Sequence, residues 1–166
     1  GCEWHELLGM KNVKNRGISS DVIQGFIDRV DPIVEGQPAK VFILGGVNDI
    51  SHDLTPDSLC TSMEKLIVKI KQGSPRTKIY LQSLLPIDNS FGRYRKMVGK
   101  EQVIVETNRL YKEMAERHGV TWIDLYSKMV DPATGSMRKG LTNDGLHLLG
   151  AGYLVWRDAV LPYVKK

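Results

Sequence analysis

Two residues near the end of the sequence have the types and the spacing of a general base and its partner. Asp144 and His147 are three positions apart in the segment Asp144-Gly145-Leu146-His147. A carboxylate that accepts a hydrogen bond from one ring nitrogen of histidine fixes the tautomer and leaves the other nitrogen free to take a proton from a nucleophile. An aspartate helix cap followed by a surface histidine would have the same spacing, and the two interpretations are evenly balanced at this point.

A second motif offers hydrogen-bond donors for a developing negative charge. Gly45-Gly46-Val47-Asn48-Asp49 follows directly after an apolar run, and an amide NH2 held at a strand end could stabilise an oxyanion. An Asn-Asp turn is the alternative, and the motif by itself favours that turn. Gly17, in Asn15-Arg16-Gly17-Ile18-Ser19, lacks a Cβ, so its backbone N–H could approach a substrate, although such a segment is ordinarily a turn.

The elements that must position these residues alternate between short apolar runs and longer amphipathic segments. The run Val41 to Leu44 is β-prone and ends in glycines, which is typical of a strand covered on both faces. Thr55 and Pro56 suit a helix N-cap and first helical position, and Pro32 is expected to bend or end an earlier helix. Strands are expected over 12–15, 41–44, 79–81 and 120–125, and helices over 3–8, 21–30, 55–70, 101–118 and 149–163.

This order of strands and helices is typical of βαβ units joined by right-handed crossovers. It predicts an α/β fold, a three-layer α/β/α sandwich around a parallel sheet, with residues 1–166 forming a single domain. Ligands of such sheets bind beyond the carboxyl ends of the strands. The motifs around Gly17 and Asn48 follow expected strands, so they should lie at that edge.

Composition and charge exclude several classes of protein. The chain has 166 residues, a formal net charge of +4, 42% hydrophobic and 25% charged residues, which excludes a disordered, collagen-like or coiled-coil protein. Arg157, Asp158 and glycines interrupt the richest apolar region, Leu146 to Val164, so we expect a soluble protein without stable membrane insertion. Its positive charges are scattered, so we expect no nucleic-acid partner.

Metal and cofactor chemistry has no support in the motifs. Cys2 and Cys60 are too few for a disulfide framework and lack metal-ligand spacing, so both are expected to be free thiols. The histidines at positions 5, 52, 118 and 147 form no ligand motif. A nucleotide-binding domain has little support, because no expected strand is followed by a glycine-rich phosphate loop. We therefore expect neither a metal nor an organic cofactor.

Taken in order, the motifs at Gly17, Gly46-Val47-Asn48-Asp49 and Asp144-Gly145-Leu146-His147 resemble the SGNH (GDSL-type) acylhydrolase superfamily over essentially the whole chain. The resemblance implies a flavodoxin-like sheet and hydrolysis of esters through an acyl-enzyme. It also implies that Gly17 and Asn48 contribute to an oxyanion hole, that His147 activates the serine, and that Asp144 orients His147.

The first block of that family, a Gly-Asp-Ser turn with the nucleophile, is missing from the sequence. In related members a segment like Gly1-Cys2-Glu3-Trp4 follows the nucleophile turn, so we expect a truncated chain that is nearly inactive. Ser19, Ser20 and Cys2 are possible replacements, but helix capping or burial explains each of them better.

The same resemblance implies that the sheet lacks its first strand, which would lie between the expected strands 12–15 and 41–44. Neighbouring strands lie about 4.8 Å apart, so the loss of one leaves unpaired backbone groups on both sides. Either the neighbours close up, or an oligomer or strand exchange with another chain fills the gap, or residues outside the given sequence do so.

The substrate is expected to be a small-molecule ester. Arg93 and Tyr94 lie in the segment Ser90 to Met97, where aromatic faces suit sugar rings and cations suit carboxylates or phosphates, although a solvated loop has the same composition. Because we find no long apolar lid, we favour a short acyl group such as acetyl on a carbohydrate. The alternatives are a lysophospholipase or thioesterase type of acylhydrolase, and a non-catalytic ligand-binding module. Both a cytoplasmic and an exported location are compatible with the sequence.

Overall fold

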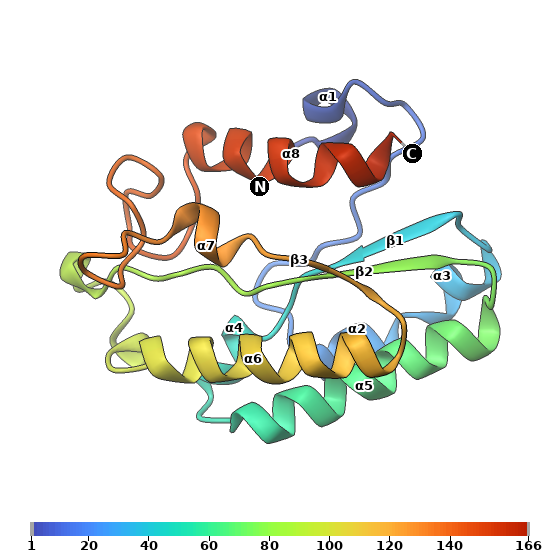
Figure 1. Ribbon diagram of the computed structural model, residues 1–166, viewed down its shortest axis with the longest axis horizontal. Helices are drawn as coiled ribbons and strands as arrows, with labels where there is room; N and C mark the ends of the chain where they lie inside the picture. The colour runs from blue at the N-terminus through green and yellow to red at the C-terminus, as the bar shows by residue number, and fades with distance from the viewer. Residues whose placement is uncertain (1, 166) are drawn as a thin grey trace.

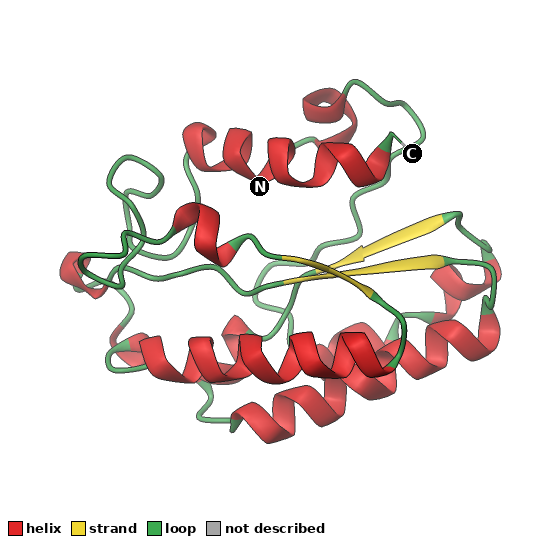
Figure 2. Cartoon of the chain, in the orientation of Figure 1, coloured by secondary structure: helices red, strands yellow, loops and turns green. Residues whose placement is uncertain are grey.

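A parallel sheet between two layers of helices forms the centre of the molecule (Figure 1, Figure 2). The computed structural model describes residues 2–165. Within these residues the sheet has three parallel strands in the order β1-β2-β3, namely β1 (Lys40–Ile43), β2 (Lys78–Gln82) and β3 (Thr121–Ile123). This arrangement confirms the predicted α/β sandwich and the expected strands 41–44, 79–81 and 120–125.

Helices cover both faces of the sheet. On one face lie α2 (Ile23–Asp28), α3 (Asp31–Glu35), α5 (Pro56–Gly73) and α6 (Glu101–Arg117), and on the other lie α1 (Trp4–Leu8) and α8 (Gly150–Val164) (Figure 1). Four short elements follow the carboxyl ends of the strands: α4 (Val47–Ser51), the 3₁₀ turns η1 (Asn89–Phe91) and η2 (Arg95–Met97), and α7 (Tyr126–Met129). No helix in residues 2–165 is long and apolar enough to span a membrane.

The alternation of side chains along the strands divides the core into two parts. Ile79 and Leu81 of β2 point into the larger core, which α2, α5 and α6 cover, whereas Tyr80 points into the smaller core beneath α1 and α8. On α5 the buried side chains recur at helical spacing, at Leu59, Met63, Leu66, Ile67 and Ile70. The Thr55 hydroxyl accepts the N–H of Ser58 and Pro56 begins this helix, as predicted.

The expected strand over 12–15 is wrong. These residues form a turn and an extended loop, although Val13 packs into the smaller core together with Phe42. A strand needs a neighbour that pairs with its backbone groups, and in the described part of the chain the sheet ends at β1. The Val13 side chain therefore packs into the core, although the backbone of residues 12–15 does not form a strand.

The expected helix over 21–30 is confirmed in a shorter form, as α2, which ends at Asp28. A separate helix, α3, begins at Asp31 with Pro32 in its first turn. Proline is tolerated there because the first-turn N–H groups have no partner within the helix. Pro32 thus begins a helix rather than ending one.

Candidate active site

The loop before α8 is held in one conformation by its own backbone. The Thr142 hydroxyl accepts the N–H groups of Gly145 at 3.0 Å and Asp144 at 3.3 Å. Asp144 Oδ1 accepts the N–H groups of Leu146 and His147, both at 2.8 Å. Gly145 has φ +90°, and a Cβ on it would lie 2.1 Å from the carbonyl oxygen of Asp88, so only glycine fits there. The backbone thus presents Asp144 and His147 on the same side of the loop.

The other oxygen of Asp144 bonds to the histidine. Nδ1 of His147 lies 2.8 Å from Asp144 Oδ2, and the side chains are 68% and 15% exposed, respectively. We call these residues the Asp144–His147 pair. An ionised carboxylate only accepts hydrogen bonds, so Nδ1 is the donor of this bond, and in the neutral imidazole Nε2 then has the free lone pair. This is the protonation pattern that a general base requires.

Hydrogen bonds keep Asp144 ionised. Its partial burial favours the neutral acid, but the N–H groups of Leu146 and His147, followed by the side chains of His147 and Tyr94, outweigh that effect. Together they hold the pKa of Asp144 well below its usual range. Because a lowered carboxyl pKa preserves the charged form as the pH falls, Asp144 stays an acceptor in neutral and mildly acidic solution.

Tyr94 completes the cluster from a distant segment. Its hydroxyl donates to Asp144 Oδ2 at 3.0 Å and lies 3.0 Å from Nδ1 of His147. The two rings meet edge to face, with their centroids 5.7 Å apart. The neighbouring Arg93 side chain is exposed. Tyr94, which the sequence suggested as a substrate contact, bonds through its hydroxyl to the Asp144–His147 pair.

Asn48 lies in the first turn of α4, and its side chain is already bonded. Its Nδ2 donates to the carbonyl oxygen of Asp21 at 2.8 Å. The adjacent Asp49 is buried, and its carboxylate accepts the N–H of Ile23 at 3.2 and 3.4 Å. Burial raises the pKa of Asp49, while the Ile23 N–H opposes that rise. The two side chains together bond α4 to the start of α2. Residues 47–51 form a short helix, where the motif by itself had favoured a turn.

Gly17 lies in the exposed loop before α2. Its N–H donates to the side-chain oxygen of Asn15 at 2.9 Å. Gly17 and Asn48 thus both form hydrogen bonds with residues just before α2: Gly17 with Asn15, and Asn48 with Asp21. Within residues 2–165, no hydrogen bond joins either of them to the Asp144–His147 pair.

Gly17 and Asn48 nevertheless lie at the same edge of the sheet as the Asp144–His147 pair. Helix α4, which contains Asn48, packs against η2, and Lys100 Nζ bonds to Asp53 at 2.6 Å just beyond these elements. Tyr94 directly precedes η2 and reaches the Asp144–His147 pair. The structure therefore brings Asp144, His147 and Tyr94 together, and it places Asn48 in the neighbouring helix α4 and Gly17 in the loop before α2.

A buried tyrosine supports the backbone in front of Asn48. The hydroxyl of Tyr111, on α6, donates to the carbonyl oxygen of Gly45 at 3.1 Å. Gly46 follows with φ +130°, and a Cβ there would lie 2.9 Å from Tyr111 Oη and 3.0 Å from Leu59 Cδ2. Tyr111 was not among the residues that the sequence suggested for the site. Its position on the apolar face of the helix was visible, but nothing in the sequence indicates which carbonyl group it contacts.

Replacing Gly46 by alanine is expected to lower the free energy of unfolding by about 3–5 kcal/mol, because strain at positive φ adds to overpacking in the core. Urea unfolding of the variant measures this loss. Gly135→Ala is the matched control, since Gly135 has φ +72° but no atom within 4 Å of the added Cβ. It should cost only the backbone term of about 1–2 kcal/mol. Equal losses in the two variants would contradict the packing argument.

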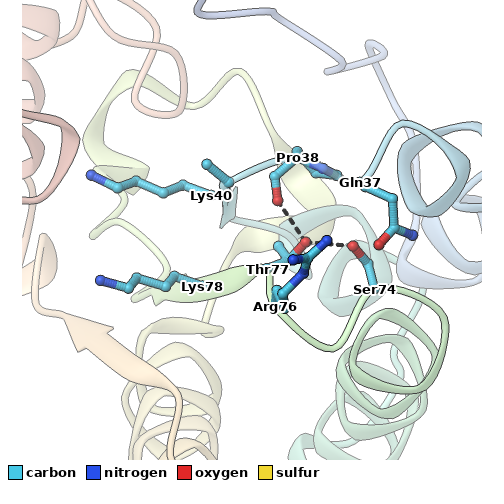
Figure 3. Close-up of a pocket in the computed structure, with 8 residues that line it drawn as sticks. Gln37, Pro38, Lys40, Ser74, Arg76, Thr77 and Lys78 are labelled. Atoms are coloured by element: carbon cyan, nitrogen blue, oxygen red, sulfur yellow. Dashed lines mark hydrogen bonds between the residues drawn. The ribbon is translucent and has the colours of Figure 1, made fainter.

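A hollow of about 460 Å³ lies at the opposite end of the sheet, at the start of β1 and β2 (Figure 3). Its lining consists of Gln37, Pro38, Ala39, Lys40, Ser74, Arg76, Thr77 and Lys78. Gln37 and Lys40 bond to helix ends there: the Gln37 amide donates to carbonyl oxygens at the ends of α3 and α5, and Lys40 Nζ to two at the end of α8. Cations near helix C-termini complement the helix dipoles, so we assign this end a structural role.

Comparisons with known proteins identify a family and solved structures with the same fold. The family model described as "GDSL-like Lipase/Acylhydrolase family" matches residues 1–155. A Bacteroides fragilis protein provisionally described as an acylhydrolase superimposes with a TM-score of 0.86 at 23% identity, covering 97% of this chain and 78% of that one. A Streptococcus pneumoniae protein provisionally described as a platelet activating factor gives 0.86 at 29% identity, covering 96% and 76%.

A variant of an acetyl-xylooligosaccharide esterase from Geobacillus has the same fold, with a TM-score of 0.74 at 18% identity over 92% of this chain and 71% of that one. A search of curated proteins gave no significant match. Within residues 2–165 no group of three or more His, Cys, Asp or Glu side chains is arranged to hold a metal ion.

Proposed function

The chain belongs to the GDSL-like lipase/acylhydrolase family, and from this membership we propose that it forms most of a serine ester hydrolase with His147 as its general base. The observation that supports this most strongly is the 2.8 Å hydrogen bond between His147 Nδ1 and Asp144 Oδ2. It leaves Nε2 unprotonated and exposed, as proton abstraction from a serine hydroxyl requires.

In the proposed reaction a serine oxygen attacks the ester carbonyl and transfers its proton to His147 Nε2. The protonated imidazole then donates to the departing alcohol, and a water molecule activated in the same way releases the acid. Asp144 keeps its charge throughout and stabilises the imidazolium that forms. These steps need only side chains and water.

We assign Asn48 and Gly17 to the oxyanion hole. An amide nitrogen has two N–H groups, and the bond from Asn48 to the Asp21 carbonyl uses one of them, so the second is free to donate to an oxyanion. Gly17 has a single N–H, which is bonded to Asn15. In this proposal that N–H moves to the oxyanion as the tetrahedral intermediate forms.

We propose that the nucleophilic serine lies upstream of Gly1, because the 166 residues contain no Gly-Asp-Ser segment. Cys2 is a poor replacement, since burial raises the pKa of its thiol and thereby lowers the fraction of reactive thiolate. We call a version of the protein that includes the upstream Gly-Asp-Ser block the extended protein. The chain without this block should be nearly inactive.

For the substrate we propose a short acyl ester, such as an acetyl group on a carbohydrate. Support comes from the acetyl-xylooligosaccharide esterase that shares the fold. The half-buried ring of Tyr94 adjoins the exposed face of His147, and it offers a flat apolar surface where a sugar ring would lie.

For the extended protein, we expect the kcat/KM for p-nitrophenyl acetate to be at least about tenfold higher than the kcat/KM for p-nitrophenyl octanoate. We also expect this protein to release acetate from acetylated xylooligosaccharides. Colorimetric rates and acetate measurement provide the test. A preference for the octanoate would contradict the short-acyl proposal. Failure to cleave any ester would contradict the function itself.

A further inference from the structure

We propose that Tyr94 is a positioning residue, which holds the Asp144 carboxylate and the Nδ1–H tautomer of His147 and does not bind substrate through its hydroxyl. This proposal rests on the proposed function, because it assigns Tyr94 a task in the same site.

The hydrogen bonds of Asp144 are divided between its two oxygens. Oδ1 is occupied by the loop's own groups, the N–H of Leu146 and of His147. Oδ2 accepts from His147 Nδ1 and from the Tyr94 hydroxyl. Among the residues that the structure describes, Tyr94 is the only one outside the loop 142–147 that hydrogen-bonds to the Asp144–His147 pair through a side chain. Its hydroxyl therefore forms the side-chain hydrogen bond by which the rest of the described fold holds that pair.

The segment that contains Tyr94 is itself braced. Asn89 Nδ2 donates to the Met97 carbonyl oxygen at 3.1 Å and to Glu101 Oε1 at 2.6 Å, and the Met97 side chain is buried. The N–H of Asp88, at the start of the segment, donates to the Gly145 carbonyl oxygen at 2.9 Å. The backbone that presents the Tyr94 hydroxyl is thus supported, and the hydrogen bond from Asp88 connects the same segment to the loop 142–147.

The Tyr94 hydroxyl has a single proton, which it donates in the hydrogen bond to Asp144. Desolvation, followed by the hydrogen bond to Asp144, raises the pKa of Tyr94. The hydroxyl therefore stays protonated over the range in which an ester hydrolase works, and it remains a donor. A second donor on Oδ2 limits rotation of the carboxylate and keeps that oxygen in line with Nδ1, which preserves the tautomer with Nε2 free.

The kinetic test is Tyr94→Phe in the extended protein, because phenylalanine keeps the ring and removes only the donor. We expect kcat to fall by roughly 10- to 100-fold, the range for one hydrogen bond to a charged group, with KM unchanged within about twofold. Tyr163→Phe, at the far end of α8, is the matched control and should leave both values unchanged. A rise in KM with an unchanged kcat would show that the Tyr94 hydroxyl binds the substrate and would overturn the proposal.

A second measurement is independent of ester hydrolysis. Nitrogen-15 NMR of the imidazoles in the 166-residue chain reports which ring nitrogen of His147 has the proton. We expect Tyr94→Phe to increase the Nε2–H tautomer and to speed exchange of the Nδ1 proton, whereas Tyr163→Phe should change neither. Identical His147 signals in wild type and Tyr94→Phe would overturn the proposal even if the enzyme is active. If no ester is cleaved, the proposed function fails while this measurement still decides the role of Tyr94.

Discussion

The extended protein is expected to hydrolyse p-nitrophenyl acetate at least ~10³-fold faster than the 166-residue chain under identical conditions. The physical reason is that, in the proposed function, the nucleophilic serine belongs to the Gly-Asp-Ser block that only the extended protein includes. The His147 imidazole and the oxyanion donors can only assist attack by water, and a positioned serine lowers the barrier by replacing one difficult step with two easier ones. Steady-state rates of the two proteins, with folding of each confirmed by circular dichroism, provide the measurement.

Equal turnover by the two proteins would contradict this prediction and would place the nucleophile within the 166 residues. Three single alanine variants, at Cys2, Ser19 and Ser20, would then identify it. Loss of activity in one of them would assign the nucleophile to that side chain.

Replacing either member of the Asp144–His147 pair in the extended protein is expected to reduce kcat by on the order of 10⁴-fold. His147→Gln removes the base. Asp144→Asn keeps the shape of the side chain, but its amide N–H2 would face Nδ1 and favour the tautomer with the proton on Nε2, which cannot accept the serine proton. Initial rates at saturating substrate measure both losses.

His118→Gln is the matched control for these variants. His118 also pairs with a carboxylate, since its Nε2 lies 2.6 Å from Glu64 Oε1, but this pair lies at the C-terminal end of α6, away from the candidate site. Its substitution should leave kcat unchanged. An Asp144→Asn variant that keeps its activity within about tenfold would show that His147 does not depend on Asp144 for its tautomer.

The sequence predicted the features that depend on neighbours along the chain. The strand at 41–44 follows from a continuous apolar run that ends in glycine, and the helix start at Thr55 follows from a cap and a proline. The contact between Asp144 and His147 belongs to the same group. Residues three positions apart in a tight loop meet with little help from the rest of the fold.

Features that depend on distant segments were not predictable. The expected strand at 12–15 is absent because a strand depends on its partner, and the local sequence does not show whether one is present. Tyr94 lies 50 positions before Asp144 in the sequence, so its loop composition suggested a substrate contact, while its hydroxyl bonds to the carboxylate. The hydrogen bond from Asn48 to Asp21 spans 27 positions, so the local sequence did not predict it either.

The two backbone bonds to Asp144 Oδ1 have a consequence for how the site evolves. An arrangement that is complete before any ligand arrives is preorganised, and its ordering cost is included in the folding of the loop rather than in each turnover. The Thr142 hydroxyl is part of the same preorganisation, because it accepts the N–H groups of Asp144 and Gly145 in this turn. Under the proposed function, the loop 142–147 can therefore keep its geometry while residues elsewhere in the site change to suit different esters.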